Sequence, residues 1–115
     1  MFNDINKLLS APCRTISSEE GAMNLADIQA QRELTSLWHY CAEENELRRT
    51  FHFDSYMATI RFVNKIAEIA EANDHHPDLF VNFKRCKVAY STHTVNGVTI
   101  NDFICVAKID QLIDI

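Results

Sequence analysis

The sequence predicts a single α+β domain, in which three helices pack on one face of a four-stranded antiparallel sheet, in the order α-β-β-α-β-β-α. Three observations support this class. The 115 residues suffice for one hydrophobic core but not for two. Segments with a helical apolar period alternate with pairs of segments in which apolar residues recur at every second position. Only two glycines and two prolines interrupt the chain, which indicates long regular elements and few loops.

The chain is expected to divide into an N-terminal arm, residues 1–16, and one domain, residues 17–115. The arm holds a short apolar cluster and then Pro12, a composition that fits either an ordered segment or a frayed end. The first helix is predicted to begin near Ser17 or Ser18, because Ser17 and Glu20 have the spacing of a capping box. Apolar residues then recur at helical spacing until the pattern runs out near Trp38: Leu25, Ile28, Leu34 and Leu37.

Two strands are predicted next, between Trp38 and Phe53, with a turn at residues 43–46 between them. In the second strand the apolar residues share one parity and the polar residues share the other. The apolar set is Leu47, Phe51 and Phe53, and the polar set is Arg48, Thr50 and His52. This alternation is typical of an antiparallel strand with one buried face.

A second helix is predicted from Asp54, a candidate N-cap. Apolar residues follow at spacings of three and four: Met57, Ile60, Val63, Ala67 and Ala70. The helix is expected to end shortly after Asn73, because Pro77 disfavours helical geometry at His76.

The C-terminal part predicts two more strands and a last helix. Val81, Phe83, Val88 and Tyr90 alternate with polar neighbours, which fits two strands joined by a turn at Lys84 and Arg85, or one long bent strand. After a loop that contains Gly97, Thr99 has the position of an N-cap and Asp102 that of its capping-box partner. The apolar residues of the last helix are Phe103, Val106, Ala107 and Ile109.

Charge and cysteine content limit the classes of function. Eleven Lys and Arg against sixteen Asp and Glu leave a net charge of −5, which disfavours direct nucleic-acid binding but permits a protein partner. The four cysteines include no C-x-x-C pair, so we expect free thiols in a reducing compartment. With no apolar signal segment or membrane span, the expected location is the cytoplasm.

Three of the five histidines are candidate site residues: the adjacent His75 and His76, and His93. They lie where a helix and a strand are predicted to end, and imidazole transfers protons near neutral pH. The residues alone leave alternatives open, namely a polar turn and an ordinary hydrogen-bonded strand end. A third alternative is a zinc site formed by these histidines with Cys86, which is disfavoured because adjacent residues such as His75 and His76 rarely bind the same ion. None of the cysteines lies in a nucleophile motif.

The residues around these histidines resemble the signatures of the pterin-4a-carbinolamine dehydratase family. Residues 70–78, AEANDHHPD, resemble the family's helix end and His-His-Pro signature. Ser91, Thr92 and His93 resemble its second signature, at the family's separation from the first. Further matches are Trp38, the strand at residues 47–53, and the group Gly97, Val98, Thr99 and Asp102. The family usually has an aromatic residue where this chain has Leu79.

The resemblance implies an enzyme that dehydrates 4a-hydroxy-tetrahydropterin to quinonoid dihydropterin and water, and so recycles the cofactor of aromatic amino-acid hydroxylases. The family uses neither a metal nor an organic cofactor. The implied acid and base catalysts are among His75, His76 and His93. The implied substrate contacts are Pro77, Thr92, Thr94, Val95, Asp102 and Trp38. The alternative for Trp38 is a place in the core. Asp102 could orient a histidine instead of the substrate, or have a purely capping role.

The resemblance also bears on partners. It implies a homodimer or homotetramer built through sheet edges and helices, and an exposed strand edge does need covering. Some relatives act as dimerisation cofactors of a homeodomain transcription factor. A non-catalytic interaction protein with a nuclear pool is therefore the alternative function.

Overall fold

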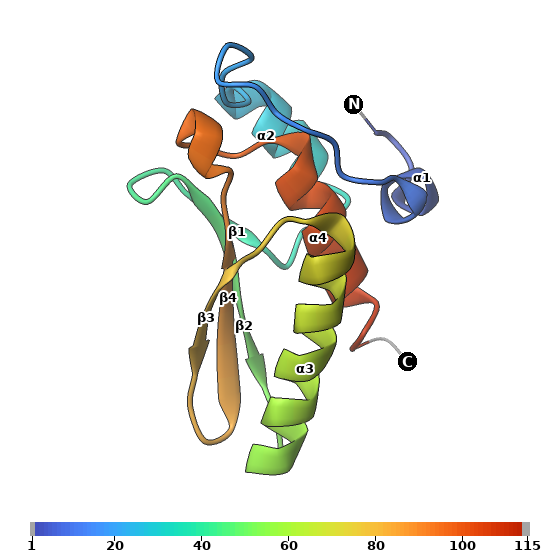
Figure 1. Cartoon of the computed structure of the whole chain (residues 1–115), viewed down its shortest axis with the longest axis vertical. Helices are drawn as coiled ribbons and strands as arrows, with labels where there is room; N and C mark the ends of the chain where they lie inside the picture. The colour runs from blue at the N-terminus through green and yellow to red at the C-terminus, as the bar shows by residue number, and fades with distance from the viewer. Residues whose placement is uncertain (1, 114–115) are drawn as a thin grey trace.

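The computed structural model describes residues 2–113 and confirms the predicted α+β class. Its four strands form one antiparallel sheet in the order β1-β2-β4-β3. Figure 1 shows this sheet nearly edge-on, with the long helices together on one side of it. The strands are β1 (His39–Cys41), β2 (Glu46–His52), β3 (Asp78–Val81) and β4 (Arg85–Tyr90), and the two long helices are α3 (Tyr56–Asn73) and α4 (Ile100–Asp110).

The inner face of the sheet forms the core, and the predicted parity of the second strand is confirmed. Leu47 of β2 pairs with Tyr90 of β4, and Phe51 pairs with Cys86. All four side chains are buried. Phe51 also contacts Phe62 of α3, with ring centroids 4.6 Å apart, so the sheet and the helix share one aromatic cluster.

The helix predicted from Ser17 to near Trp38 is wrong at both ends, because the observed helix spans only residues 25–32. The backbone N–H of Ser17 does donate to Glu20 Oε2 at 2.7 Å, as in a capping box, but a turn follows instead of a helix. Gly21 then adopts a φ of 74°, which a helix does not allow. The helix α2 (Leu25–Arg32) begins only after Asn24, whose side chain caps it.

A short helix that the sequence pattern did not indicate, α1 (Ile5–Ser10), lies in the N-terminal arm. It packs against α4 on the side away from the sheet (Figure 1). Leu8 is fully buried there. Lys108 of α4 donates from Nζ to the carbonyls of Leu9 and Ala11, at 2.7 and 2.8 Å. The arm is thus attached to α4 by apolar packing and by hydrogen bonds.

The second predicted helix is confirmed as α3, with two shifts. Its N-cap is Ser55, one residue after the expected Asp54, and Ser55 Oγ accepts from the N–H of Ala58. The buried stripe is Thr59, Phe62, Ile66 and Ala70. Met57, which was predicted on the apolar face, lies on the outer side of the helix and is 61% exposed. The face that packs on the core is the one that carries the bulky Phe62 and Ile66.

The second strand pair is a hairpin, not one bent strand. Its turn spans residues 82–84, where the N–H of Asn82 donates to the carbonyl of Arg85 at 2.9 Å. β3 is an edge strand. Phe80 on this strand is 56% exposed, and Phe83 within the turn is 65% exposed.

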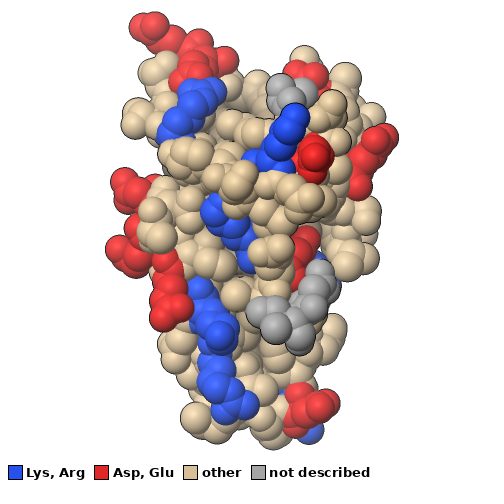
Figure 2. All heavy atoms as spheres, turned by 90° about the vertical axis from the view of Figure 1, so that its right-hand side faces the viewer, with Lys and Arg blue, Asp and Glu red and all other residues tan. Residues whose placement is uncertain are grey.

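The predicted capping box of the last helix is confirmed at Thr99 and Asp102. Almost every residue of α4 is buried, because the sheet and α3 cover one side while α1 and the arm cover the other. Seen from the helical side, acidic and basic groups are interspersed over the surface, without a large field of one sign (Figure 2). Within residues 2–113, no helix combines the length and the apolar character that crossing a membrane requires.

Candidate active site

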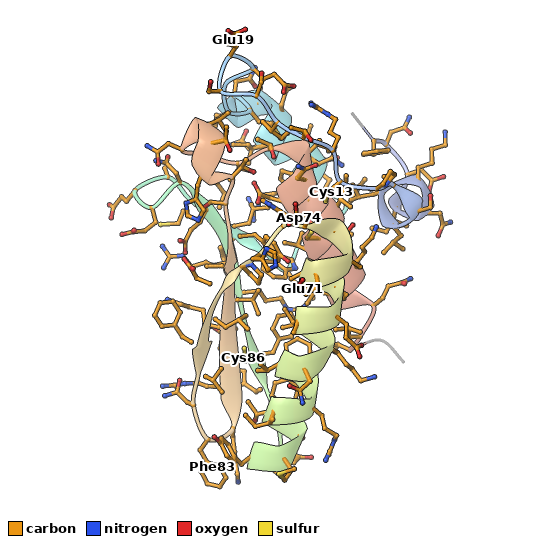
Figure 3. The ribbon with its side chains drawn as sticks, viewed as in Figure 1. Cys13, Glu19, Glu71, Asp74, Phe83 and Cys86 are labelled. Atoms are coloured by element: carbon orange, nitrogen blue, oxygen red, sulfur yellow. The ribbon has the colours of Figure 1, made fainter. Side chains whose placement is uncertain are left out.

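A cavity of about 320 Å³ lies where α3 ends, between the N-terminal arm and the loop that follows β4. Figure 3 shows Cys13 of the arm and Asp74 of the helix end next to each other at this place. The lining residues are Cys13, Arg14, Thr15, Ile16, Asn73, Asp74, His75, Thr92, Thr94 and Asn101. A larger cavity of about 480 Å³ lies between the arm and α2, and its lining includes none of the candidate histidines. The smaller cavity is therefore the candidate active site.

The way α3 ends places His75 in the cavity wall. Asp74 adopts a left-handed conformation with φ 49°, and this conformation stops the helix. The backbone N–H of His75 still donates to the carbonyl of Ala70 at 3.1 Å. Tyr90 donates from its hydroxyl to the His75 carbonyl at 3.0 Å, and the two rings lie 5.2 Å apart. The helix end and the central strand thus both hold His75 in place.

His75 is bonded to a buried carboxylate. Its Nε2 lies 2.6 Å from Oδ1 of Asp102, which is fully buried. The other carboxylate oxygen, Oδ2, accepts from the N–H of Thr99 and from the hydroxyl of Thr92, both at 2.9 Å. The hydroxyls of Thr92 and Thr99 are 2.7 Å apart. Asp102 therefore serves the capping box through one oxygen and the imidazole through the other.

This pairing sets the protonation of His75. Burial by itself lowers the pKa of the imidazole, but the hydrogen bond and the negative charge of Asp102 outweigh it, and the pKa of His75 is raised. Because an ionised carboxylate only accepts, Nε2 carries the proton of the neutral ring. Within residues 2–113, no protein group hydrogen-bonds to the second ring nitrogen, Nδ1.

The other two candidate histidines lie outside this network. The side chain of His76 is 53% exposed, and its Nε2 is 3.2 Å from Oε1 of Glu71 on the surface of α3. His93 is exposed on a short 3-10 helix, η1 (His93–Val95). In the described part of the chain, neither ring hydrogen-bonds to His75. Both are sequence neighbours of cavity residues, His76 of His75 and His93 of Thr92 and Thr94.

The predicted substrate contacts are placed unequally. Thr94 lines the cavity and is exposed, whereas the hydroxyl of Thr92 is buried and bonded to Asp102. Pro77 and Val95 are half-buried beside the histidines.

Trp38 lies in the core, which was the alternative to its predicted contact with the substrate. Its side chain is fully buried, its ring contacts Phe51 edge-on at 5.9 Å, and its Nε1 donates to Oδ1 of Asp110 at 2.8 Å. Trp38 is therefore not a wall of the cavity.

The N-terminal arm supplies the part of the site that the sequence pattern did not reveal. The backbone of Arg14 is paired with the side chain of Asn101, through an N–H bond of 3.0 Å to Oδ1 and a bond of 2.6 Å from Nδ2 to the carbonyl. These contacts place residues 13–16 against the cavity. No local pattern signals them, because they depend on how the arm folds back onto α4.

Residues 2–113 contain no group of three or more His, Cys, Asp or Glu side chains placed to hold a metal ion. Cys86, the ligand considered for zinc, is buried under the sheet opposite Phe51.

The sequence is similar to that of known proteins over most of its length. Residues 22–112 match the family model for pterin 4 alpha carbinolamine dehydratase. A protein of Xylella fastidiosa, provisionally named pterin-4-alpha-carbinolamine dehydratase, is 38% identical over 111 residues, which are 96% of each chain. A protein of Nitrosospira multiformis with the same provisional name is 39% identical over the whole of both chains.

Among solved structures, the transcriptional coactivator/pterin dehydratase of Brucella melitensis superposes with a TM-score of 0.76 at 25% identity. The match covers 80% of this chain and 98% of that one. The extent of the match to the family model and the similarity to full-length relatives lead to one conclusion: the chain belongs to the pterin 4 alpha carbinolamine dehydratase family.

Proposed function

We propose that the protein is a hydro-lyase that dehydrates 4a-hydroxy-tetrahydropterin to quinonoid dihydropterin and water, with His75 as its central proton-transfer residue. The observation that carries this proposal is the imidazole of His75 in the cavity wall, held by the buried Asp102. A histidine with one nitrogen bound to a carboxylate and the other free is suited to general acid–base catalysis.

The reaction needs two proton movements that imidazoles can supply. The C–O bond at the 4a carbon breaks as the hydroxyl oxygen takes up a proton and leaves as water. The lone pair of the adjacent ring nitrogen forms the new C=N bond, and the displaced N–H proton goes to a base. His75 Nδ1 takes up or gives one of these protons, and Asp102 stabilises the imidazolium form.

The second proton-transfer group is assigned to His76 or His93. Both are exposed and adjacent in sequence to cavity residues, so a bound pterin at the cavity mouth can approach them. Thr94, Val95 and Pro77 are assigned to contact the pterin at the same mouth. The role of Thr92 is shifted from substrate contact to support of Asp102, because its hydroxyl is already used there.

The test is stopped-flow dehydration of a chemically generated 4a-hydroxy-tetrahydropterin. We expect clear acceleration by the wild type and a loss of about 10²–10⁴-fold in kcat for His75→Ala. His52→Ala is the matched control, because His52 is exposed on β2 and takes no part in the cavity. The proposal fails if the wild type does not exceed buffer, or if His75→Ala equals His52→Ala.

The proposal extends to the cellular setting. The reaction fits tetrahydropterin recycling, and the four free thiols fit a reducing compartment such as the cytoplasm. Assembly as a homodimer or homotetramer is part of the proposal, because the edge strand β3 and the exposed Phe80 offer a surface for a second copy. Light scattering during size-exclusion chromatography, repeated with Phe80→Glu, tests it: a monomeric wild type would contradict it.

A second candidate function is that of an interaction protein. The observation that favours it is the Brucella melitensis structure, described as both a transcriptional coactivator and a pterin dehydratase. A protein in which His75→Ala abolishes dehydration but leaves partner capture intact would carry both functions. A protein that does not accelerate dehydration but still captures a partner would be an interaction protein only.

A further inference from the structure

Two cysteines from distant parts of the sequence meet beside the cavity. The sulfurs of Cys13, in the N-terminal arm, and Cys105, on α4, are 3.6 Å apart. We infer that they form a modification site: a thiol pair that a peroxide converts into an intramolecular disulfide in the cavity wall. In the described part of the chain, Cys41 and Cys86 have no sulfur neighbour at hydrogen-bonding distance.

A row of side chains on α4 holds the arm so that the two sulfurs face each other. Asn101, Cys105 and Lys108 follow at spacings of four and three and thus lie on one side of the helix. Asn101 bonds to the backbone of Arg14 at both ends of its amide, and Lys108 bonds to the carbonyls of Leu9 and Ala11. The arm is therefore fixed on both sides of Cys13.

The two thiols differ in reactivity. Cys13 is half-buried and lines the cavity, so a small oxidant can reach it. The hydrogen bond from the Cys105 thiol lowers the pKa of Cys13, and His75 and Lys108 act in the same direction. Cys105 is fully buried, and its hydrogen bond to Cys13 together with burial raises its pKa. Cys13 is thus the attacking thiolate and Cys105 the resolving thiol.

The chemistry balances with a hydroperoxide as the oxidant. The Cys13 thiolate attacks one peroxide oxygen and the O–O bond breaks. The departing oxygen takes the proton that Cys13 released on ionisation, so the products are Cys13 sulfenic acid and water or an alcohol. The Cys105 sulfur then attacks the sulfenyl sulfur and the S–O bond breaks as the S–S bond forms, and the departing hydroxide takes the Cys105 thiol proton and leaves as water. Two thiols are oxidised and one peroxide is reduced.

The geometry allows this bond to close. A disulfide has an S–S length of about 2.05 Å, so the sulfurs must approach by about 1.5 Å. Cys105 lies within α4, but Cys13 lies in a segment without helix or strand pairing. Cys13 can shift by this amount between its anchors at Ala11 and Arg14 without breaking a helix or the sheet.

The modification changes the cavity. Residues 13–16 form one part of its wall, and Asn101 and Asp102 precede Cys105 on α4. A disulfide draws Cys13 toward α4, and it removes a group whose negative charge, when the thiol is ionised, raises the pKa of His75. A change in dehydration rate on oxidation rests on the proposed function, whereas formation of the disulfide does not.

The experiment uses the reduced full chain and hydrogen peroxide at near-stoichiometric amounts. We expect the number of titratable thiols to fall from four to two. The intact mass should fall by about 2 Da, and a proteolytic peptide should join Cys13 to Cys105. A dithiol reductant should restore all four thiols.

Two matched variants complete the test. Cys13→Ser should lose no mass with peroxide, whereas Cys41→Ser, which removes another half-buried thiol, should still do so. Oxygen addition without a cross-link, a cross-link that persists in Cys13→Ser, or a purely intermolecular disulfide would each overturn the inference. The mass and thiol counts do not depend on turnover, so a protein that forms the disulfide but dehydrates no pterin refutes only the proposed function.

Discussion

His75 and His76 are neighbours in the sequence and lie in opposite environments. The side chain of His75 is 12% exposed and bound to a fully buried carboxylate, whereas that of His76 is 53% exposed and bound to Glu71, which is 81% exposed. A surface pair such as His76 with Glu71 contributes about 0–1 kcal/mol to stability. The buried pair of His75 with Asp102 fixes the imidazole ring in one orientation. One residue of the His-His pair is thus fixed inside the protein, and the other lies at its surface.

The two pairs should differ most in stability when the acidic residue of each, Asp102 or Glu71, is replaced. Asp102→Ala leaves the N–H of Thr99, the hydroxyl of Thr92 and the imidazole of His75 without their acceptor in a buried place. We expect the free energy of unfolding to fall by about 3 kcal/mol or more. Glu71→Ala should change it by less than about 0.5 kcal/mol. Urea unfolding followed by circular dichroism measures both, and equal effects would show that the two pairs do not differ as described.

A smaller effect is expected from the threonines of the loop after β4. Thr92→Val keeps the shape of the side chain but removes one donor to Asp102 Oδ2 and the partner of the Thr99 hydroxyl. It should cost about 1–2 kcal/mol of stability. Thr94→Val, also in the cavity lining but exposed, should stay within about 0.5 kcal/mol. If Thr94→Val proved the more costly, support of the carboxylate by Thr92 would be refuted.

Two capping boxes show how far the local sequence predicts the fold. Thr99 with Asp102 and Ser17 with Glu20 have the same spacing, yet only the first begins a helix. After Thr99 an apolar run follows that is buried on all sides, and this packing stabilises the helix. After Glu20 comes Gly21 in a left-handed conformation, and few buried residues support the next turn. The alternation of apolar and polar residues predicted the second strand correctly, because this pattern depends directly on which face of the strand is buried.

What the sequence pattern missed depends on the long-range position of the arm. Leu8 is buried and Cys13 touches Cys105 only because the arm folds back over α4. No periodicity across so long a separation encodes such a contact. In the site, His75 was identified with its signature, and orientation of a histidine was one of the roles left open for Asp102. The fold was needed to show that the histidine is His75 and that Asp102 keeps its capping role as well.

The smallest effect is a dependence of stability on pH that should arise from His75. The pKa of His75 in the folded protein is raised, with the opposing effect of burial outweighed by Asp102. A group of this kind stabilises the fold fully below its unfolded pKa of about 6.5. That contribution is lost as the pH rises through the higher folded pKa.

The difference in unfolding free energy between the wild type and His75→Gln should therefore shrink from pH 6 to pH 8. Urea unfolding across this range measures this difference, and titration of the imidazole signals by NMR identifies the group. The effect should be smaller than that of Asp102→Ala, because deprotonation of His75 removes one charge but keeps the Nε2–H bond to the carboxylate. A difference that grows with pH would mean that burial, and not Asp102, controls the pKa of His75.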